Sequence, residues 1–172
     1  AAPDRIVYYD DSGLPWITGL EYCSIPKLFL SIDSHHHSRW HGPFSALFDT
    51  VFVSHLDHLD EFRKFNENAV WFPLWATDIP ELPEERTIDC CFRGSMNVEI
   101  HPGRQIFFDS LNKLTPVDAR PGPWKEAYPQ AKIVVNQAVS SDLNFRVFEA
   151  LASGAMLLTP RIENGLLQLF NE

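Results

Sequence analysis

Short apolar runs alternate with helix-like segments along this chain, and that alternation is the feature that most restricts its fold. Most runs are almost continuously apolar, which is typical of strands covered on both faces. The runs occupy residues 5–9, 27–32, 50–54, 70–72, 87–92, 132–136 and 155–159. Helical patterns occupy residues 41–48, 59–66, 102–112, 144–153 and 165–170. A repeated order of strand and then helix predicts an α/β protein with parallel sheets and right-handed crossovers.

The segment 73–86 breaks this alternation. It contains Pro73, Pro80 and Pro83 together with several acidic residues, a composition that disfavours both helix and strand. The sequence therefore predicts an extended linker here, between a first unit at residues 1–86 and a second at 87–172.

Charge is distributed unevenly over the 172 residues, whose net charge is −9. Residues 1–87 hold 6 Lys/Arg against 14 Asp/Glu, a balance of −8, whereas residues 88–172 hold 8 against 9, a balance of −1. The overall acidity argues against nucleic acid as a partner. A doubly anionic phosphate ligand is better tolerated in the second half.

The three cysteines do not form a disulfide framework. Cys90 and Cys91 are adjacent, so in a strand they point to opposite faces, and with Cys23 they are typical of small core residues in a reducing compartment. No stretch approaches the roughly 20 apolar residues that span a bilayer, and no basic-then-apolar leader opens the sequence. These features predict a cytoplasmic protein without a membrane span.

Residues 132–160 read as strand, short loop, helix and strand. Ser141 or Asp142 is expected to cap the helix, and Gly154 to end it in a left-handed conformation. Arg146 and Glu149 fall on one stripe of the helix with Asp142 and Ser153, opposite a packing side of Leu143, Val147, Ala150 and Leu151.

The start of such a helix, at the carboxyl end of a strand, is where open α/β sheets bind ligands, and its free N–H groups favour phosphate. Arg146 would add a forked donor. The alternative is an exposed Arg146–Glu149 ion pair, worth a few tenths of a kcal/mol. Asn136, where the preceding strand ends, can equally be a turn former.

Residues 145–160 resemble the donor-binding motif of group 1 glycosyltransferases, in which a helix reading Glu-Ala-small-Ala-Ser/Cys-Gly precedes a hydrophobic strand. The chain is most similar to the bacterial spore-maturation glycosyltransferase-like subfamily. The matching positions are Asn136, Asp142, Asn144, Arg146, Glu149 and Asn164–Gly165, with residues 89–95 and 101–104 similar further upstream. No Gly-x-Gly-x-x-Gly follows any strand, which argues against a dehydrogenase.

This resemblance implies the two-domain GT-B fold, with Rossmann-like units. Residues 1–86 would be the end of the N-terminal, acceptor-side unit, and residues 87–172 most of the unit that binds the nucleotide-sugar donor. The implied activity is transfer of a sugar from a nucleoside-diphosphate sugar to an acceptor, whether glycan, lipid or protein. The alternative is a donor-binding module without transfer activity.

The resemblance also implies roles for individual residues. Arg146 and Arg104, with the loop at Gly94 and Ser95, would hold the pyrophosphate, and Glu149 would accept hydrogen bonds from the ribose. Helix N–H groups and arginines can stabilise the leaving diphosphate without a metal or other cofactor. The donor-binding set is Gly94, Ser95, Arg104, Asn136, Asp142, Asn144, Arg146 and Glu149. One departure is Ser141, which stands where the wider clan carries a glutamate.

Histidines gather at residues 35–37 and 41, with two more at 55 and 58. A metal site is one interpretation, but consecutive histidines diverge in direction and lack a recurrent carboxylate or thiol partner, so we expect no structural ion. His35 follows the strand 27–32, where a general base toward an acceptor hydroxyl, or a hydrogen-bond partner of the donor sugar, could lie. Otherwise these histidines are solvated loop residues.

Overall fold

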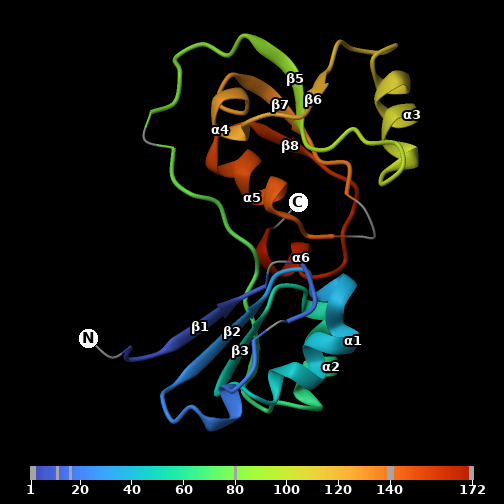
Figure 1. Cartoon of the computed structure of the whole chain (residues 1–172). Helices are drawn as coiled ribbons and strands as arrows, with labels where there is room; N and C mark the ends of the chain where they lie inside the picture. The colour runs from blue at the N-terminus through green and yellow to red at the C-terminus, as the bar shows by residue number, and fades with distance from the viewer. Residues whose placement is uncertain (1–2, 11, 16, 80, 139–141, 171–172) are drawn as a thin grey trace. The chain divides into compact units, whose positions relative to one another are not determined.

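The protein is a mixed α/β chain with two four-stranded, all-parallel sheets (Figure 1). Its structure is a computed structural model that describes residues 3–10, 12–15, 17–79, 81–138 and 142–170. The chain forms two compact units, one of residues 1–74 with 163–172 and one of residues 75–162. The predicted α/β class with parallel sheets is confirmed.

The first unit contains a sheet in the strand order β1-β2-β3-β4. Each strand pairs in parallel with the next, so that Tyr8 lies beside Phe29 and Phe29 beside Val51. Two α-helices cross between strands, α1 after β2 and α2 after β3. The elements are β1 (Ile6–Tyr9), η1 (Leu20–Tyr22), β2 (Lys27–Ser31), α1 (Ser34–Ser45), β3 (Thr50–Val53), η2 (Leu56–His58), α2 (Leu59–Arg63) and β4 (Ala69–Trp71).

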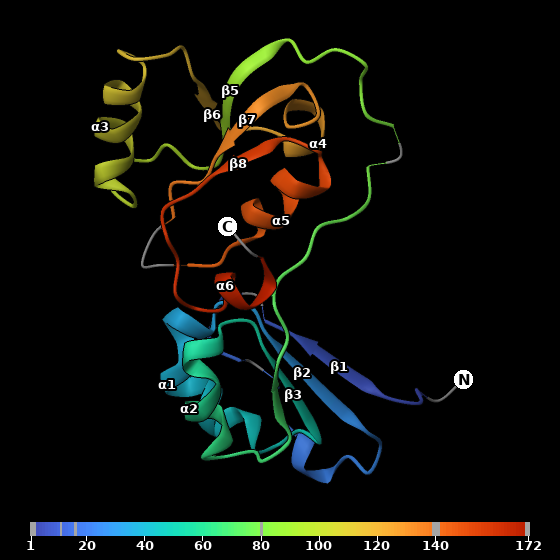
Figure 2. The same ribbon diagram turned by 180° about the vertical axis from the view of Figure 1, so that it is seen from behind.

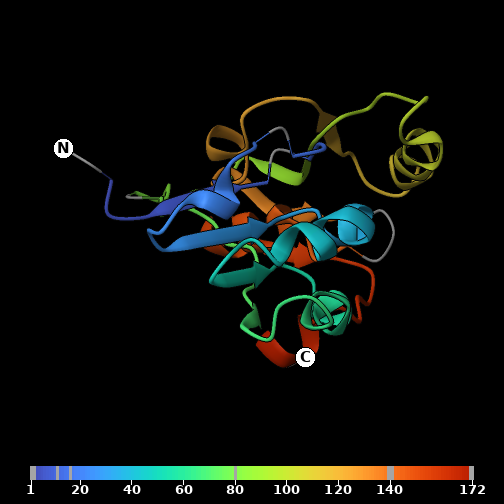
Figure 3. The same cartoon turned by 60° about the horizontal axis from the view of Figure 1, so that its bottom comes forward.

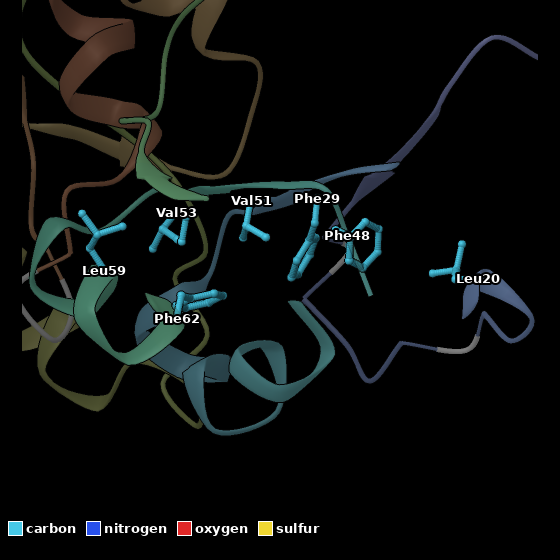
Figure 4. Close-up of a cluster of buried hydrophobic side chains, with 8 residues drawn as sticks. Leu20, Phe29, Phe48, Val51, Val53, Leu59 and Phe62 are labelled. Atoms are coloured by element: carbon cyan, nitrogen blue, oxygen red, sulfur yellow. The ribbon is translucent and has the colours of Figure 1, made fainter. Parts of the chain in front are cut away.

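The core of the first unit lies on one face of its sheet, under α1 and α2 (Figures 1 and 3). Phe29 stacks on Phe48 at 5.1 Å between ring centroids, and Phe62 of α2 closes the layer (Figure 4). On the other face, Val7 and Val70 are 54% and 41% exposed. The edge strands β1 and β4 therefore leave one face exposed, unlike the two-sided burial that their apolar composition predicts.

Residues 163–172 belong to the first unit, although the whole second unit precedes them in sequence. They include α6 (Leu166–Leu169), whose N-cap Gly165 has φ 116°. A Cβ atom built on Gly165 would lie 2.5 Å from the Trp71 ring, and the Leu56 amide donates to the Asn164 carbonyl at 3.4 Å. This packing explains why the compact units differ from the expected division into residues 1–86 and 87–172.

The second unit contains a sheet in the order β6-β5-β7-β8 (Figure 2). The central pair is β5 and β7, in which Cys90 lies beside Ile133. Residues 73–79 and 81–86, ahead of this sheet, hold no helix or strand. The elements are β5 (Ile88–Arg93), α3 (Pro102–Leu111), β6 (Asp118–Arg120), α4 (Trp124–Ala127), β7 (Ala131–Val135), α5 (Phe145–Ala152) and β8 (Met156–Leu158).

Both faces of the second sheet carry a core. Cys91 packs with Ala127 of α4 and Ala150 of α5, whereas Cys90 packs with Phe108 of α3 on the opposite face. Burial raises the pKa of the Cys91 thiol to about 11, so this side chain stays a thiol at neutral pH. The prediction that Cys90 and Cys91 are core residues on opposite faces is confirmed.

Two local predictions require correction. Helix α1 begins at Ser34 instead of residue 41 and includes four histidines, which contradicts the interpretation of these residues as a loop. Histidine has only moderate helix propensity, but His41 and Ser45 are buried, so tertiary packing decides the helix. Strand β6 and helix α4 were not predicted.

None of the helices in the described part of the chain combines the length and apolar character that crossing a membrane requires.

Candidate functional site

A cavity of about 370 Å³ lies in the second unit, where α3 and α5 begin. Both helices follow strands of the parallel sheet, so the cavity is at the carboxyl edge, the usual ligand-binding edge of such sheets. Its lining combines two arginines with polar and acidic side chains. The lining residues are Ser95, His101, Arg104, Asp142, Asn144, Phe145, Arg146 and Glu149.

Arg146 is held in place by neutral oxygen acceptors. Its Nε and Nη2 both donate to the Arg93 carbonyl, at 3.1 and 3.0 Å, and its Nη1 donates to Asn136 Oδ1 at 2.9 Å. Asn144 donates to the same Asn136 oxygen at 3.1 Å. The guanidinium carbon lies 4.3 Å from the centre of the Phe92 ring.

Arg104, in the first turn of α3, is held in the same way and is only 5% exposed. Its Nε donates to Gln137 Oε1 at 2.9 Å and its Nη1 to the Ser95 carbonyl at 2.7 Å. The guanidinium carbon lies 5.1 Å from the centre of the same Phe92 ring. Burial, followed by the nearby charge of Arg146, lowers the pKa of Arg104.

In the described part of the chain, these two arginines have no acidic partner. Among the described residues, no carboxylate lies within ion-pair distance, 4.0 Å, of either guanidinium group. Both arginines also occupy the first turn of a helix, where the helix dipole disfavours a cation by roughly 0.3–1 kcal/mol. An anion in the cavity would relieve both costs, and the orphan N–H groups of two helix termini would add donors.

Gly94 makes room for this arrangement. A Cβ atom at Gly94 would lie 2.7 Å from Arg146 Nη2 and 2.8 Å from Phe92 Cζ. Only glycine lets the Arg146 guanidinium approach the backbone after β5 this closely.

The interpretation of Arg146 and Glu149 as an exposed ion pair is wrong. Within the described residues, the Glu149 carboxylate is not within ion-pair distance of Arg146, which is instead engaged with Arg93 and Asn136. Burial raises the pKa of Glu149 to about 6, and the positive charge of Arg146 opposes that shift only in part. The two side chains share a cavity instead of a surface pair.

The raised pKa predicts how stability depends on pH. The fold favours the neutral form of Glu149. The contribution of this side chain to the free energy of unfolding is therefore greatest at pH values below the ordinary glutamate pKa of 4.5, and it falls as the pH rises through about 6. We expect Glu149→Gln to unfold at a higher temperature than the parent at pH 8 and at nearly the same temperature at pH 4.5. Glu126→Gln, at an exposed position, is the matched control. A difference for Glu149→Gln that does not change between the two pH values would contradict the prediction.

The structure brings the predicted donor-binding residues of the second unit together. Arg146 touches or bonds to several of them, and the remainder line the cavity. The residues gathered here are Gly94, Ser95, Arg104, Asn136, Asp142, Asn144, Arg146 and Glu149. His35 lies in the first unit, in the first turn of α1, with its ring centroid 4.3 Å from that of His55.

Details of helix α5 differ from the prediction. Asn144 caps it by accepting from the Arg146 amide at 3.1 Å, in place of Asp142; Ser141 lies outside the described residues. Gly154 ends the helix at φ 66°, as predicted. Ser153 is buried and Leu151 is 40% exposed, the reverse of the predicted faces; both lie where α5 ends, and Ser153 is its C-cap residue.

Several residues that form the site were not predicted as site residues from the sequence. Phe92 is an ordinary apolar strand residue in the sequence, and Gln137 a loop residue. His101 lines the cavity and lies at the N-cap position of α3, where burial, followed by the charges of Arg104 and Arg146, lowers its pKa. The Pro102 that follows, at the first position of a helix, was the available signal for that N-terminus.

The comparisons with known proteins bear on this same region. No curated protein matches the chain. A family model described as glycosyl transferase-like matches residues 118–172. That stretch contains β7, α5 and the site residues Asn136, Asp142, Asn144, Arg146 and Glu149. This part of the chain is therefore similar to a glycosyltransferase family.

Proposed function

We propose that the second unit binds a nucleoside-diphosphate sugar and that the protein takes part in transferring its sugar to an acceptor. The observation that carries the proposal is the pair Arg104 and Arg146. Arg104 is buried and Arg146 is half-buried, and the two cations line one cavity where two helices begin. Neither is neutralised by a carboxylate of the described residues. Such a site favours a ligand with two adjacent negative charges.

In this proposal the diphosphate lies against the two guanidinium groups and the loop at Gly94 and Ser95. Glu149, on the same side of α5, accepts hydrogen bonds from ribose hydroxyls. As the sugar leaves, charge develops on the diphosphate, and the fixed cations and helix N–H groups stabilise it without requiring a metal or other cofactor.

The finer features of the proposal rest on resemblance. They are the GT-B arrangement, membership of the spore-maturation glycosyltransferase-like subfamily and a bacterial type of enzyme. His35 is the proposed general base toward an acceptor hydroxyl, since an imidazole can exchange a proton near neutral pH. The acceptor would be a glycan, a lipid or a protein.

Thermal unfolding with uridine, guanosine, adenosine and thymidine diphosphates tests the donor site directly. A ligand at 100 times its dissociation constant stabilises the fold by about 2.7 kcal/mol, so the matching diphosphate is expected to raise the unfolding temperature clearly. The corresponding nucleosides are the controls for base binding alone. No shift with any diphosphate would contradict the proposal. Turnover of the sugar donor separates a transferase from a module that only binds it.

A further inference from the structure

We infer that Phe92 is a positioning residue that sets the two arginines at a spacing suited to the two phosphates of one diphosphate. The inference deepens the proposed function and rests on it. It assigns a role in selectivity to a side chain that is fully buried and therefore need not touch the ligand.

The geometry places Phe92 between two parts of the site that are far apart in sequence. Phe92 is near the end of β5, Arg104 is in the first turn of α3, and Arg146 is in the first turn of α5. Both guanidinium carbons lie within cation–π distance of the single ring, at 5.1 and 4.3 Å. Phe92 is the common contact between the two cations.

A neutral ring suits this position better than a carboxylate. Two guanidinium groups repel each other, and the charge of Arg146 adds to burial, the larger cause, in lowering the pKa of Arg104. A carboxylate would relieve it but would also cancel the positive charge that an anion needs. The electron-rich face of a phenyl ring attracts both cations and leaves their charge available.

Gly94 preserves the contact between ring and guanidinium. Its missing side chain is the space into which Arg146 Nη2 and Phe92 Cζ fit, at 2.7 and 2.8 Å from where a Cβ would be. The methyl group of Gly94→Ala would therefore push the Arg146 guanidinium away from the Phe92 ring, while the ring itself stays in the core. The φ of Gly94 is not positive, so alanine adds no backbone strain there.

The inference predicts selectivity between phosphate ligands. If Phe92 sets the arginines at the spacing of two linked phosphates, inorganic pyrophosphate contacts both arginines at once, whereas a single orthophosphate cannot contact both equally well. Loss of the positioning ring should therefore weaken pyrophosphate much more than orthophosphate. A general loosening of the fold would weaken both alike.

The experiment compares calorimetric titrations of the full chain with inorganic pyrophosphate and with orthophosphate at one ionic strength. Phe92→Leu is expected to weaken pyrophosphate by about tenfold and orthophosphate by at most about twofold. Phe108→Leu is the matched control, because Phe108 is also buried and packs against Phe92 at 4.6 Å between centroids. It removes a ring from the same cluster and should leave the ratio of the two affinities unchanged.

Gly94→Ala provides the second arm, and it decides the question if Phe92→Leu does not fold. It should lower the pyrophosphate-to-orthophosphate ratio as Phe92→Leu does. An unchanged ratio in the folded variant, or an equal change in Phe108→Leu, would overturn the role of Phe92 while leaving diphosphate binding by the parent intact. If the parent binds neither pyrophosphate nor any nucleoside diphosphate, the proposed function fails and this inference fails with it.

Discussion

Arg146→Ala is expected to weaken nucleoside diphosphate binding by about 1.5–3 kcal/mol, or roughly 10- to 150-fold. The substitution removes a charge-assisted donor from a partly buried site, where solvent screens it poorly. The Arg93 carbonyl and Asn136 Oδ1 also lose their hydrogen bonds to Arg146 and keep only those from Tyr128 and Asn144, so the helix start loosens. Calorimetry at low and high salt should show the parent losing affinity with salt more steeply than the variant.

Arg120→Ala is the control for this loss of charge. Arg120 is in the same unit, but its side chain is 67% exposed and pairs with Asp118 at 2.9 Å. A similar loss of affinity in both variants would mean that binding depends only on the overall electrostatic field of the unit and not on contacts made by Arg146. Glu149→Ala adds a second contrast, because it should weaken the nucleoside diphosphate while inorganic pyrophosphate binds almost as before. Equal small losses for both ligands in Arg146→Ala and Glu149→Ala would refute the site.

Gly165→Ala is expected to destabilise the first unit by about 3 kcal/mol. Two effects add, since alanine is strained at φ 116° and its methyl group would meet the Trp71 ring at 2.5 Å. Trp71 also donates from Nε1 to the Ser54 carbonyl at 3.2 Å, so the ring cannot move away without losing a hydrogen bond. Urea unfolding followed by tryptophan fluorescence should show a lower midpoint at an unchanged slope.

Gly19→Ala separates the two effects. Gly19 also has a positive φ, 87°, but a Cβ there meets nothing within 4 Å. This variant should lose only about 1 kcal/mol, the cost of the backbone conformation. If the two variants lose the same amount, the contact between Gly165 and Trp71 contributes nothing to stability.

Local signals explain what the sequence predicted well. The pattern from residue 132 to 160 contains a buried strand, a helical stripe and a glycine stop, and each of these needs only neighbouring residues to form. Gly154 adopts the left-handed conformation for the same reason. Arg146 and Glu149 could be placed on one side of α5 because helical spacing alone decides which residues share a face.

The unpredicted features depend on contacts between distant residues. Strand β6, Asp118–Arg120, has one apolar residue and exists because it pairs with β5 and because Asp118 bonds to Arg93 at 2.5 Å. The part that Phe92 plays depends on two helices starting at one sheet edge, which no local window contains. Sequence spacing likewise could not show that Arg146 donates hydrogen bonds to the Arg93 carbonyl and does not pair with Glu149.

The discontinuous first unit has a consequence for the order of folding during synthesis. Residues 163–172 leave the ribosome only after the entire second unit. Before that, the Trp71 ring cannot pack against Gly165, and the Leu56 amide cannot donate to the Asn164 carbonyl. Domains generally fold in the order in which they emerge, but of these two units the one that begins to emerge earlier is completed later. Until then, the Trp71 ring lacks the cover that Gly165 gives it, so protection of this apolar surface depends on how quickly the later residues are made.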